Sequence, residues 1–186
     1  MKIFVIGGKA KCGKTTFGEY LREQLKYYGY KPCVMHLTDP LYGYARNYFE
    51  WNEVTDPKPR EFLQKMGTEL IREKMGKKDF LLNRLYEDIE ILSNFFDAFI
   101  ITDARLIYEF ESIRNKYDDV VTIKIERKQY DNYLSEEEAN HITEKGLDNY
   151  EDFDYIVHNN NLDDLETSAL EIVRNEENYG GEIIWV

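Results

Sequence analysis

The sequence is poor in cysteine, in basic residues and in long apolar runs. Its two cysteines, Cys12 and Cys33, cannot build a disulfide framework, and we predict that both are reduced thiols. No stretch approaches the roughly 18 to 20 consecutive apolar residues that span a bilayer, which argues against a transmembrane segment. An apolar run begins directly after Met1-Lys2, so we expect no signal or transit peptide and a cytoplasmic protein.

Basic residues are outnumbered by acidic ones, 24 Lys and Arg against 36 Asp and Glu, and the formal net charge is −12. Nucleic acids and anionic membranes bind basic surfaces, so we expect neither as a partner. Small-molecule nucleotides are the expected ligands of a monomer or homodimer. Because the overall charge repels nucleotides, each local cluster of arginine is informative.

The chain of 186 residues is long enough for one domain with its own core, and 42% of the residues are hydrophobic. The sequence contains no internal repeat and no low-complexity tract. Its cysteines and histidines lack the spacing of a zinc site. We therefore expect a single domain over residues 1–186.

A glycine-containing motif lies close to the start of the chain. Residues 8–15, Gly-Lys-Ala-Lys-Cys-Gly-Lys-Thr, fit the P-loop pattern G-x-x-x-x-G-K-[ST] and follow the apolar run 3–6. The glycines allow successive N–H groups to face one concavity, and the following helix directs its positive end there. Lys14 is predicted to bind the β- and γ-phosphates, and the Thr15 hydroxyl to bind the accompanying Mg²⁺. A chance match in a glycine-rich turn is the alternative, but the strand before and the helix after favour nucleotide binding.

The motif also predicts how the two cysteines differ. A helix N-terminus and three nearby lysines favour the thiolate of Cys12, so we expect it to be the more reactive thiol. Cys33 lies in an apolar strand segment and is expected to be inert.

Two aspartates follow apolar segments that are predicted to be strands. The segment 33–37 precedes Asp39, and the segment 98–102 precedes Asp103. In open α/β sheets ligands bind beyond the carboxyl ends of the strands, so both are candidate site residues, with Asp103 on the metal side of the site. A helix N-cap is the alternative for Asp39 and a surface turn is the alternative for Asp103, because Asp favours both positions.

The segment 60–72 predicts a helix with two different faces. Its apolar stripe consists of Phe62, Leu63, Met66 and Leu70. Side chains that can donate hydrogen bonds recur at every fourth position on the other side: Arg60, Gln64, Thr68 and Arg72. These donors suit phosphates and base edges, although a polar stripe can also be a merely solvated face.

Five predicted strands alternate with helices, at residues 3–6, 33–37, 98–102, 120–125 and 155–158. Parallel neighbours need right-handed helical crossovers, so we expect an α/β fold of three layers around a five-stranded parallel sheet. Apolar periodicity is lost between residues 129 and 152. An insert of this length is typical of a functional segment, a disordered one or a movable lid.

Several further motifs in the sequence resemble those of one protein family. They are Asp39-Pro40-Leu41; Arg60, Leu63, Gln64, Gly67, Thr68, Glu69 and Arg72; Thr102-Asp103-Ala104-Arg105 with Glu109; His141 with Glu144; and Asp154, Ile156 and Asn159 with Leu162 and Leu165. In these patterns the chain resembles, nearly from end to end, the phage-type deoxynucleoside monophosphate kinases of the P-loop nucleoside monophosphate kinase group. The resemblance implies a P-loop NTPase fold with strand order 2-3-1-4-5, an acceptor-binding helical region at about 39–96 and a lid at about 127–152.

The P-loop motif and the resemblance together assign roles to the candidate residues. Catalysis is assigned to Lys14, Asp39 and Arg127. ATP binding is assigned to Lys11, Cys12, Gly13, Lys14, Thr15, Thr16, Arg127 and Asn159. Acceptor binding is assigned to Asp39, Arg60, Gln64, Thr68, Arg72, Asp103 and Arg105. Mg²⁺, which accompanies the ATP donor, is assigned to Thr15 and Asp103.

Three functions are compatible with these assignments. The first is ATP-dependent phosphoryl transfer to a (deoxy)nucleoside monophosphate, giving the diphosphate. The second is a P-loop kinase with a hydroxyl acceptor of the nucleoside or dephospho-coenzyme A type, which would need Asp39 as a general base. The third is a regulatory nucleotide-binding protein without turnover, for which the sequence shows no GTPase-type base motif. Arg60, Arg72 and Arg105 favour the anionic acceptor in so acidic a chain.

Overall fold

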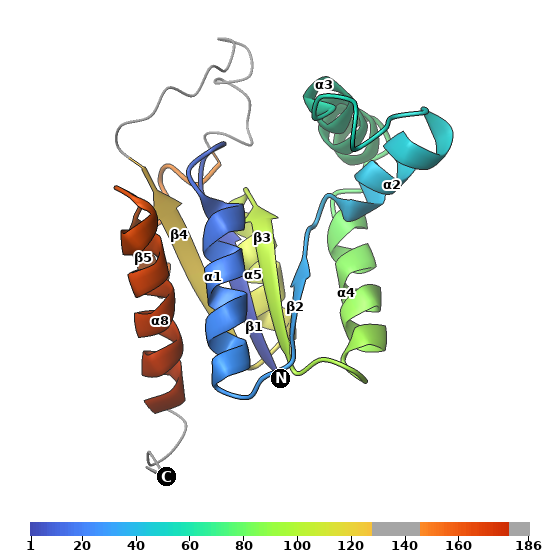
Figure 1. Cartoon of the computed structure of the whole chain (residues 1–186). Helices are drawn as coiled ribbons and strands as arrows, with labels where there is room; N and C mark the ends of the chain where they lie inside the picture. The colour runs from blue at the N-terminus through green and yellow to red at the C-terminus, as the bar shows by residue number, and fades with distance from the viewer. Residues whose placement is uncertain (128–145, 179–186) are drawn as a thin grey trace. The chain divides into compact units, whose positions relative to one another are not determined.

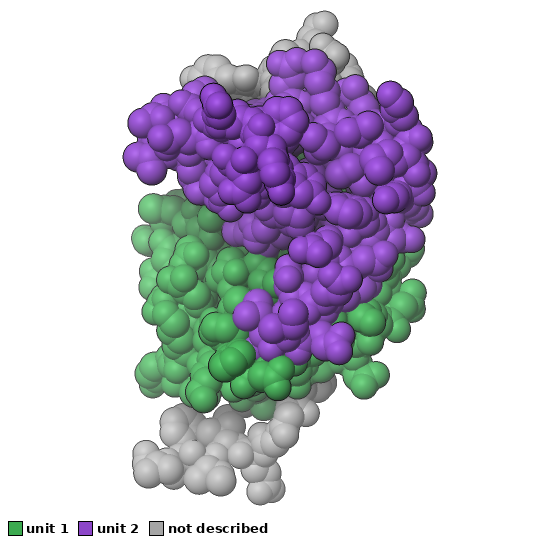
Figure 2. Space-filling view, turned by 90° about the vertical axis from the view of Figure 1, so that its right-hand side faces the viewer, with its two compact units in different colours: residues 1–35, 93–186 green, residues 36–92 purple. Residues whose placement is uncertain are grey.

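The computed structural model of the chain describes residues 1–127 and 146–178. The chain divides into two compact units (Figure 2). Unit 1 comprises Met1–Met35 and the chain from Ser93 onward, and unit 2 comprises His36–Leu92. Most of the predicted lid, with His141 and Glu144, lies outside the described residues.

A five-stranded parallel sheet forms the centre of unit 1, in the order β2-β3-β1-β4-β5. Its strands are β1 (Lys2–Gly7), β2 (Pro32–Met35), β3 (Ala98–Ala104), β4 (Val120–Glu126) and β5 (Tyr155–His158). In the central strands Ile3 of β1 pairs with Phe99 of β3 and with Val120 of β4. Continuous apolar runs are typical of strands that are buried on both faces, and Phe4 and Ile100 are indeed fully buried. The predicted α/β class and strand order are confirmed.

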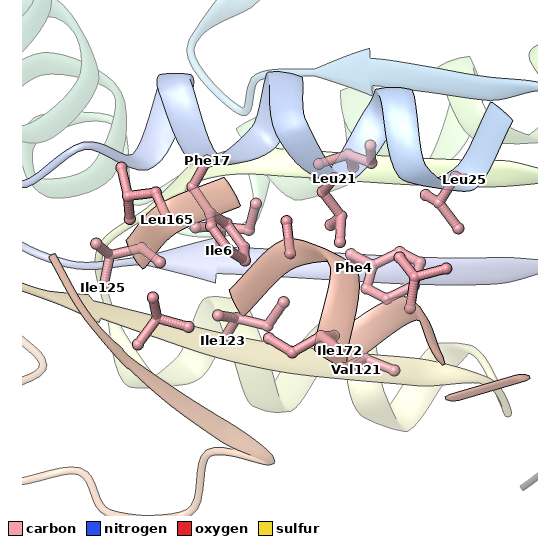
Figure 3. Close-up of a cluster of buried hydrophobic side chains, with 14 of the residues drawn as sticks. Phe4, Ile6, Phe17, Leu21, Leu25, Val121, Ile123, Ile125, Leu165 and Ile172 are labelled. Carbon is pink, nitrogen blue, oxygen red and sulfur yellow. The ribbon is translucent and has the colours of Figure 1, made fainter. Parts of the chain in front are cut away.

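Helices cover both faces of this sheet. Helices α1 (Lys14–Tyr27) and α8 (Leu162–Asn178) lie side by side on one face, and α5 (Ile107–Lys116) lies on the other (Figure 1). The core between the sheet and the helix pair is shown in Figure 3 and includes Phe4, Ile6, Phe17, Leu21, Leu25, Ile123, Leu165 and Ile172. Nowhere in residues 1–127 and 146–178 is a helix long and apolar enough to cross a membrane.

Unit 2 is helical. It contains α2 (Asp39–Tyr48), α3 (Arg60–Gln64), the π-helix η1 (Lys65–Lys74) and α4 (Phe80–Leu92). The segment predicted as one α-helix therefore changes geometry after Gln64, and the wider π-helical turn changes which side chains share a face. Leu70, assigned to the apolar stripe, is exposed, whereas Thr68 and Ile71 are buried. The predicted apolar stripe is therefore wrong at Leu70.

Candidate active site

The loop between β1 and α1 takes a shape that depends on its glycines. Gly8 and Gly13 have φ angles of 141° and 107°. A side chain at Gly8 would come within 2.4 Å of the carbonyl oxygen of Ile125, and one at Gly13 within 2.5 Å of Asn159 Nδ2. Both positions need glycine for conformation and for space. The first turn of α1 follows at once, so its unpaired N–H groups open toward the loop.

Lys14 folds back over this loop. Its Nζ donates hydrogen bonds to the carbonyl oxygens of Gly8 at 2.8 Å and of Lys9 at 2.6 Å, and only 8% of the residue is exposed. The two carbonyls hold the ammonium group at the loop, where it can neutralise a bound phosphate. Thr15 and Thr16 are exposed in the first turn of α1.

Both cysteines are free thiols, as predicted, but their burial differs from what the predicted reactivities require. Cys12 is buried, with 1% of the residue exposed, and its Sγ lies 3.8 Å from Lys14 Nζ. Cys33 is only half-buried. Because a thiol must be accessible to react, this burial argues against the prediction of a reactive Cys12 and an inert Cys33. Cys12 contributes its backbone to the loop.

The end of β3 brings Asp103 and Arg105 beside the start of the loop. β3 extends two residues beyond the predicted strand and includes the half-buried Asp103, while its residue Ala104 pairs with Gly7. Arg105 follows directly. The buried carboxylate of Glu109 accepts hydrogen bonds from the N–H groups of Arg105 at 2.8 Å and Leu106 at 3.0 Å. Glu109 therefore fixes the backbone of Arg105 while it caps α5.

Arg127 and Asn159 follow the next two strands of the sheet. Arg127 is exposed at the end of β4. Asn159 follows β5, is 6% exposed, and donates a hydrogen bond from its backbone N–H to the carbonyl oxygen of Glu126 at 2.7 Å. Its side-chain Nδ2 donates to the carbonyl oxygen of Cys12 at 2.8 Å. The structure thus brings the P-loop together with Asn159 from the opposite end of the sequence.

Two further residues lie against the end of β1 or against the loop and were missed by sequence reasoning. Leu147 is 7% exposed, and a side chain at Gly7 would come within 2.8 Å of its Cδ1. Asp148 forms an ion pair with Lys9, with 2.9 Å between Oδ1 and Nζ. Both lie in the stretch where apolar periodicity is lost, so no pattern connects them to the loop in advance.

In unit 2, Asp39 is held as a carboxylate at the start of α2. Its Oδ2 accepts a hydrogen bond from the backbone N–H of His36 at 3.1 Å, and its Oδ1 lies 3.5 Å from His36 Nδ1. Burial acts to raise the pKa of Asp39, but the hydrogen bonds and charge of His36 and the charge of Arg46 lower it below its ordinary value. Asp39 makes no N-cap hydrogen bond to α2, because Thr38 occupies that position.

The four predicted donors of unit 2 lie on one continuous helical segment. Arg60 and Gln64 are in α3, and Thr68 and Arg72 are in η1. Thr68 is 7% exposed and the other three are half-buried. Hydrogen bonds to an anion are stronger where water is partly excluded, and π-helical turns recur at functional sites. The burial of this row argues against a merely solvated face.

The residues assigned to Mg²⁺ fit an ion that arrives with a nucleotide. Within residues 1–127 and 146–178 no group of three or more His, Cys, Asp or Glu side chains could hold a metal alone. Mg²⁺ does not require one, because it keeps several waters and takes one or two protein ligands together with phosphate oxygens. The hydroxyl of Thr15 and the carboxylate of Asp103 are hard oxygen donors of the kind that Mg²⁺ prefers.

The parallel sheet of order β2-β3-β1-β4-β5, with a phosphate loop after β1, defines a P-loop kinase. Solved structures share the fold over most of both chains. A shikimate kinase from Bacteroides thetaiotaomicron is 17% identical, with a TM-score of 0.53 and coverage of 95% of this chain and 98% of that one. A gluconokinase from Sinorhizobium meliloti 1021 is 16% identical, with a TM-score of 0.52 and coverage of 96% and 95%. At these identities the likeness concerns the fold alone.

The sequence model of the deoxynucleotide monophosphate kinase family matches residues 44–169, more than half of the chain. The protein belongs to this family, and it is an ATP-dependent phosphotransferase of the P-loop class. The match begins beyond the P-loop and Asp39, so these two features rest on the sequence motif and on the structure. Among curated protein sequences none matches the chain.

Proposed function

We propose that this kinase transfers the γ-phosphoryl group of ATP, bound with Mg²⁺, to a (deoxy)nucleoside monophosphate. The choice of acceptor rests on the match to the deoxynucleotide monophosphate kinase family and on the half-buried arginines Arg60 and Arg72 of unit 2. The pKa of Asp39, which His36 and Arg46 lower, agrees with this choice. A general base works best when its pKa is near the working pH, so Asp39 is a poor base for a hydroxyl acceptor. A monophosphate has a second pKa of about 6 and attacks without a base.

The donor is bound in unit 1. The N–H groups of the loop and of the first turn of α1 donate hydrogen bonds to the β- and γ-phosphates, and Lys14 neutralises the charge that develops on the migrating group. Thr15 and Asp103 would hold Mg²⁺, which would neutralise negative charge on the nucleotide phosphates. The exposed Arg127 supplies a further positive charge on the ATP side.

In unit 2 the residues that we assign to the acceptor are Arg60, Gln64, Thr68 and Arg72. In unit 1, Arg105 keeps its assignment to the acceptor from the sequence. Arginine can make two parallel hydrogen bonds to a phosphate, which fixes its orientation as well as its position. The carboxylate of Asp39 can accept hydrogen bonds from the sugar hydroxyls of the acceptor. Catalysis then rests on holding two anions in line rather than on proton removal.

The acceptor class is tested by ADP release with nucleoside monophosphates, deoxynucleoside monophosphates, nucleosides and dephospho-coenzyme A. Turnover is expected only with monophosphates. Asp39→Asn should lower kcat by less than about 10²-fold without changing the pH profile, since loss of a general base costs about 10²- to 10⁴-fold. Turnover of a nucleoside, or recovery of Asp39→Asn at high pH, would instead identify a hydroxyl acceptor.

Arg60→Ala tests the acceptor site directly. The KM for the monophosphate should rise about 10- to 150-fold, as expected when a hydrogen bond to a charged group worth about 1.5 to 3 kcal/mol is lost. The KM for ATP should stay unchanged. Arg84→Ala is a matched control, because Arg84 is an exposed arginine of the same unit that pairs with Glu87 at 3.3 Å. An unchanged acceptor KM in Arg60→Ala would remove Arg60 from the site.

A further inference from the structure

Asn159 is a buried amide that joins the end of β5 to the phosphate loop. Its Nδ2 donates a hydrogen bond of 2.8 Å to the carbonyl oxygen of Cys12, a residue 147 positions earlier in the chain. Its backbone N–H donates to the carbonyl oxygen of Glu126 at 2.7 Å, which ties Asn159 to the end of β4. The backbone of Asn159 is therefore bound to the sheet, while its side chain is bound to the loop.

The loop approaches this amide as closely as a glycine allows. A Cβ at Gly13 would lie 2.5 Å from Asn159 Nδ2 and 3.3 Å from Leu165 Cδ1. The Lys14 ammonium group binds the carbonyls of Gly8 and Lys9. Two side chains, Lys14 and Asn159, thus hold three of the loop's carbonyl oxygens.

The contact determines how one peptide group of the loop is oriented. The carbonyl of Cys12 and the N–H of Gly13 belong to the same planar trans peptide, so they point in opposite directions. When the carbonyl is bound to Asn159, the N–H of Gly13 must point away from Asn159. Glycine tolerates φ angles of either sign, so without this bond the peptide could turn over at low cost. The reversed peptide would present a carbonyl oxygen, rather than an N–H, to a phosphate.

We propose that Asn159 is a positioning residue for polyphosphate binding, which holds the Cys12–Gly13 peptide so that the N–H of Gly13 is available to the phosphates of ATP. The inference rests on the proposed role of the loop as the ATP site. It differs from the role assigned from sequence, in which Asn159 contacts ATP itself. Asn159 acts here through the backbone of the loop and touches no reacting atom.

Inorganic tripolyphosphate is the probe that separates these roles, because it carries phosphates without a base or sugar. Its affinity and that of ATP are measured by calorimetry for the wild type, Asn159→Ala and the isosteric Asn159→Asp, well below each protein's Tm. Both variants should bind both ligands about tenfold or more weakly, since one N–H contact to an anion is no longer presented. Asn160→Ala is the control, because the exposed Asn160 pairs with Asp164 at 2.9 Å and should leave both affinities unchanged.

Protonation provides a second readout. A protonated carboxyl can again donate to the Cys12 carbonyl, so the tripolyphosphate affinity of Asn159→Asp should recover as the pH falls, relative to Asn159→Ala at the same pH. A merely structural role would lower Tm and leave the affinity of the folded variants unchanged, which would overturn the proposal. Loss of ATP binding with unchanged tripolyphosphate binding would overturn it in favour of a base contact. A wild type that failed to bind tripolyphosphate would overturn the ATP site as well.

Discussion

Lys14 shows how single side chains at this site are held in place before any ligand binds. Only 8% of the residue is exposed, and two loop carbonyls orient its amine. Asp39 is oriented in the same manner by His36 in unit 2. Such prior orientation is what positional and electrostatic catalysis requires, because the groups need not reorganise during the reaction.

Lys14→Met should reduce phosphoryl transfer to background, because the aliphatic stem remains while the charge on the migrating group is no longer neutralised. The circular dichroism spectrum should stay unchanged. Lys26→Met provides the control, since Lys26 pairs with Glu23 on the exposed side of α1 and should retain full activity. Full activity in Lys14→Met, measured by ADP release, would refute the assignment of the loop.

Thr102→Val should increase the free energy of unfolding by about 1 kcal/mol. Thr102 is 2% exposed, and its Oγ1 is buried without a hydrogen-bond partner among the described residues. In the variant a methyl group replaces this hydroxyl group. The cost of burying an unpaired polar atom is removed, while the size of the side chain stays the same. Thr122→Val should do the opposite, because Thr122 Oγ1 lies 2.8 Å from Asp154 Oδ2. Urea unfolding of both variants checks the prediction, and equal destabilisation of the two would contradict it.

At the scale of elements, one ion-paired junction connects α5, β4 and the start of β5. Arg114 of α5 donates from Nη2 to Thr122 Oγ1 and to Asp154 Oδ2, both at 2.7 Å. The backbone N–H of Thr122 in β4 donates to the same carboxylate oxygen at 2.7 Å. Burial acts to raise the pKa of Asp154, but these hydrogen bonds and the charge of Arg114 lower it below its ordinary value. The junction holds β5 in register beside β4.

Asp154→Asn should destabilise the protein most at neutral pH. Because the pKa of Asp154 is lower in the folded protein, its contribution is fully present above the ordinary Asp pKa of about 3.9 and is lost as the pH falls through the folded value. The stability gap between wild type and variant should therefore narrow below about pH 4. Unfolding curves across this range test it, with the exposed Asp118→Asn as the control. A gap that stayed constant with pH would show that the charge of Asp154 is not involved.

At the scale of the whole molecule, an anionic ligand must approach a protein of net charge −12. The long-range field repels the nucleotide, whereas the attraction that we propose at the loop comes from the buried Lys14 and from backbone N–H groups. Salt screens the long-range repulsion far more than the short-range attraction at the loop, because the Debye length falls from about 30 Å at 0.01 M to about 8 Å at 0.15 M. The two effects therefore respond differently to ionic strength.

The Kd for ATP at constant Mg²⁺ should accordingly stay within about twofold, or become tighter, over this range of salt. Isothermal calorimetry in potassium acetate at about 0.01 M and about 0.15 M ionic strength measures this Kd. A protein that bound through exposed basic side chains would lose affinity steeply. A tenfold weakening here would mean that exposed lysines such as Lys9 and Lys11, rather than Lys14, dominate the attraction.

Local patterns in the sequence predicted the five strands and the P-loop. The family resemblance predicted the order of the strands in the sheet. Short-range periodicity reports the strands directly, and the residues of a phosphate loop are consecutive, so both can be predicted without knowledge of packing. The bounds of β5 were predicted as observed, because the apolar segment 155–158 is flanked by polar residues.

Only the tertiary structure decided which side chains are buried and which distant residues meet. The π-helical geometry of η1 buries Thr68 and exposes Leu70, and packing buries Cys12. The bond from Asn159 to Cys12 joins residues from opposite ends of the chain, and the lowered pKa of Asp39 depends on where His36 and Arg46 lie. Periodicity describes one segment at a time, whereas burial and pKa values depend on the neighbours that folding brings together.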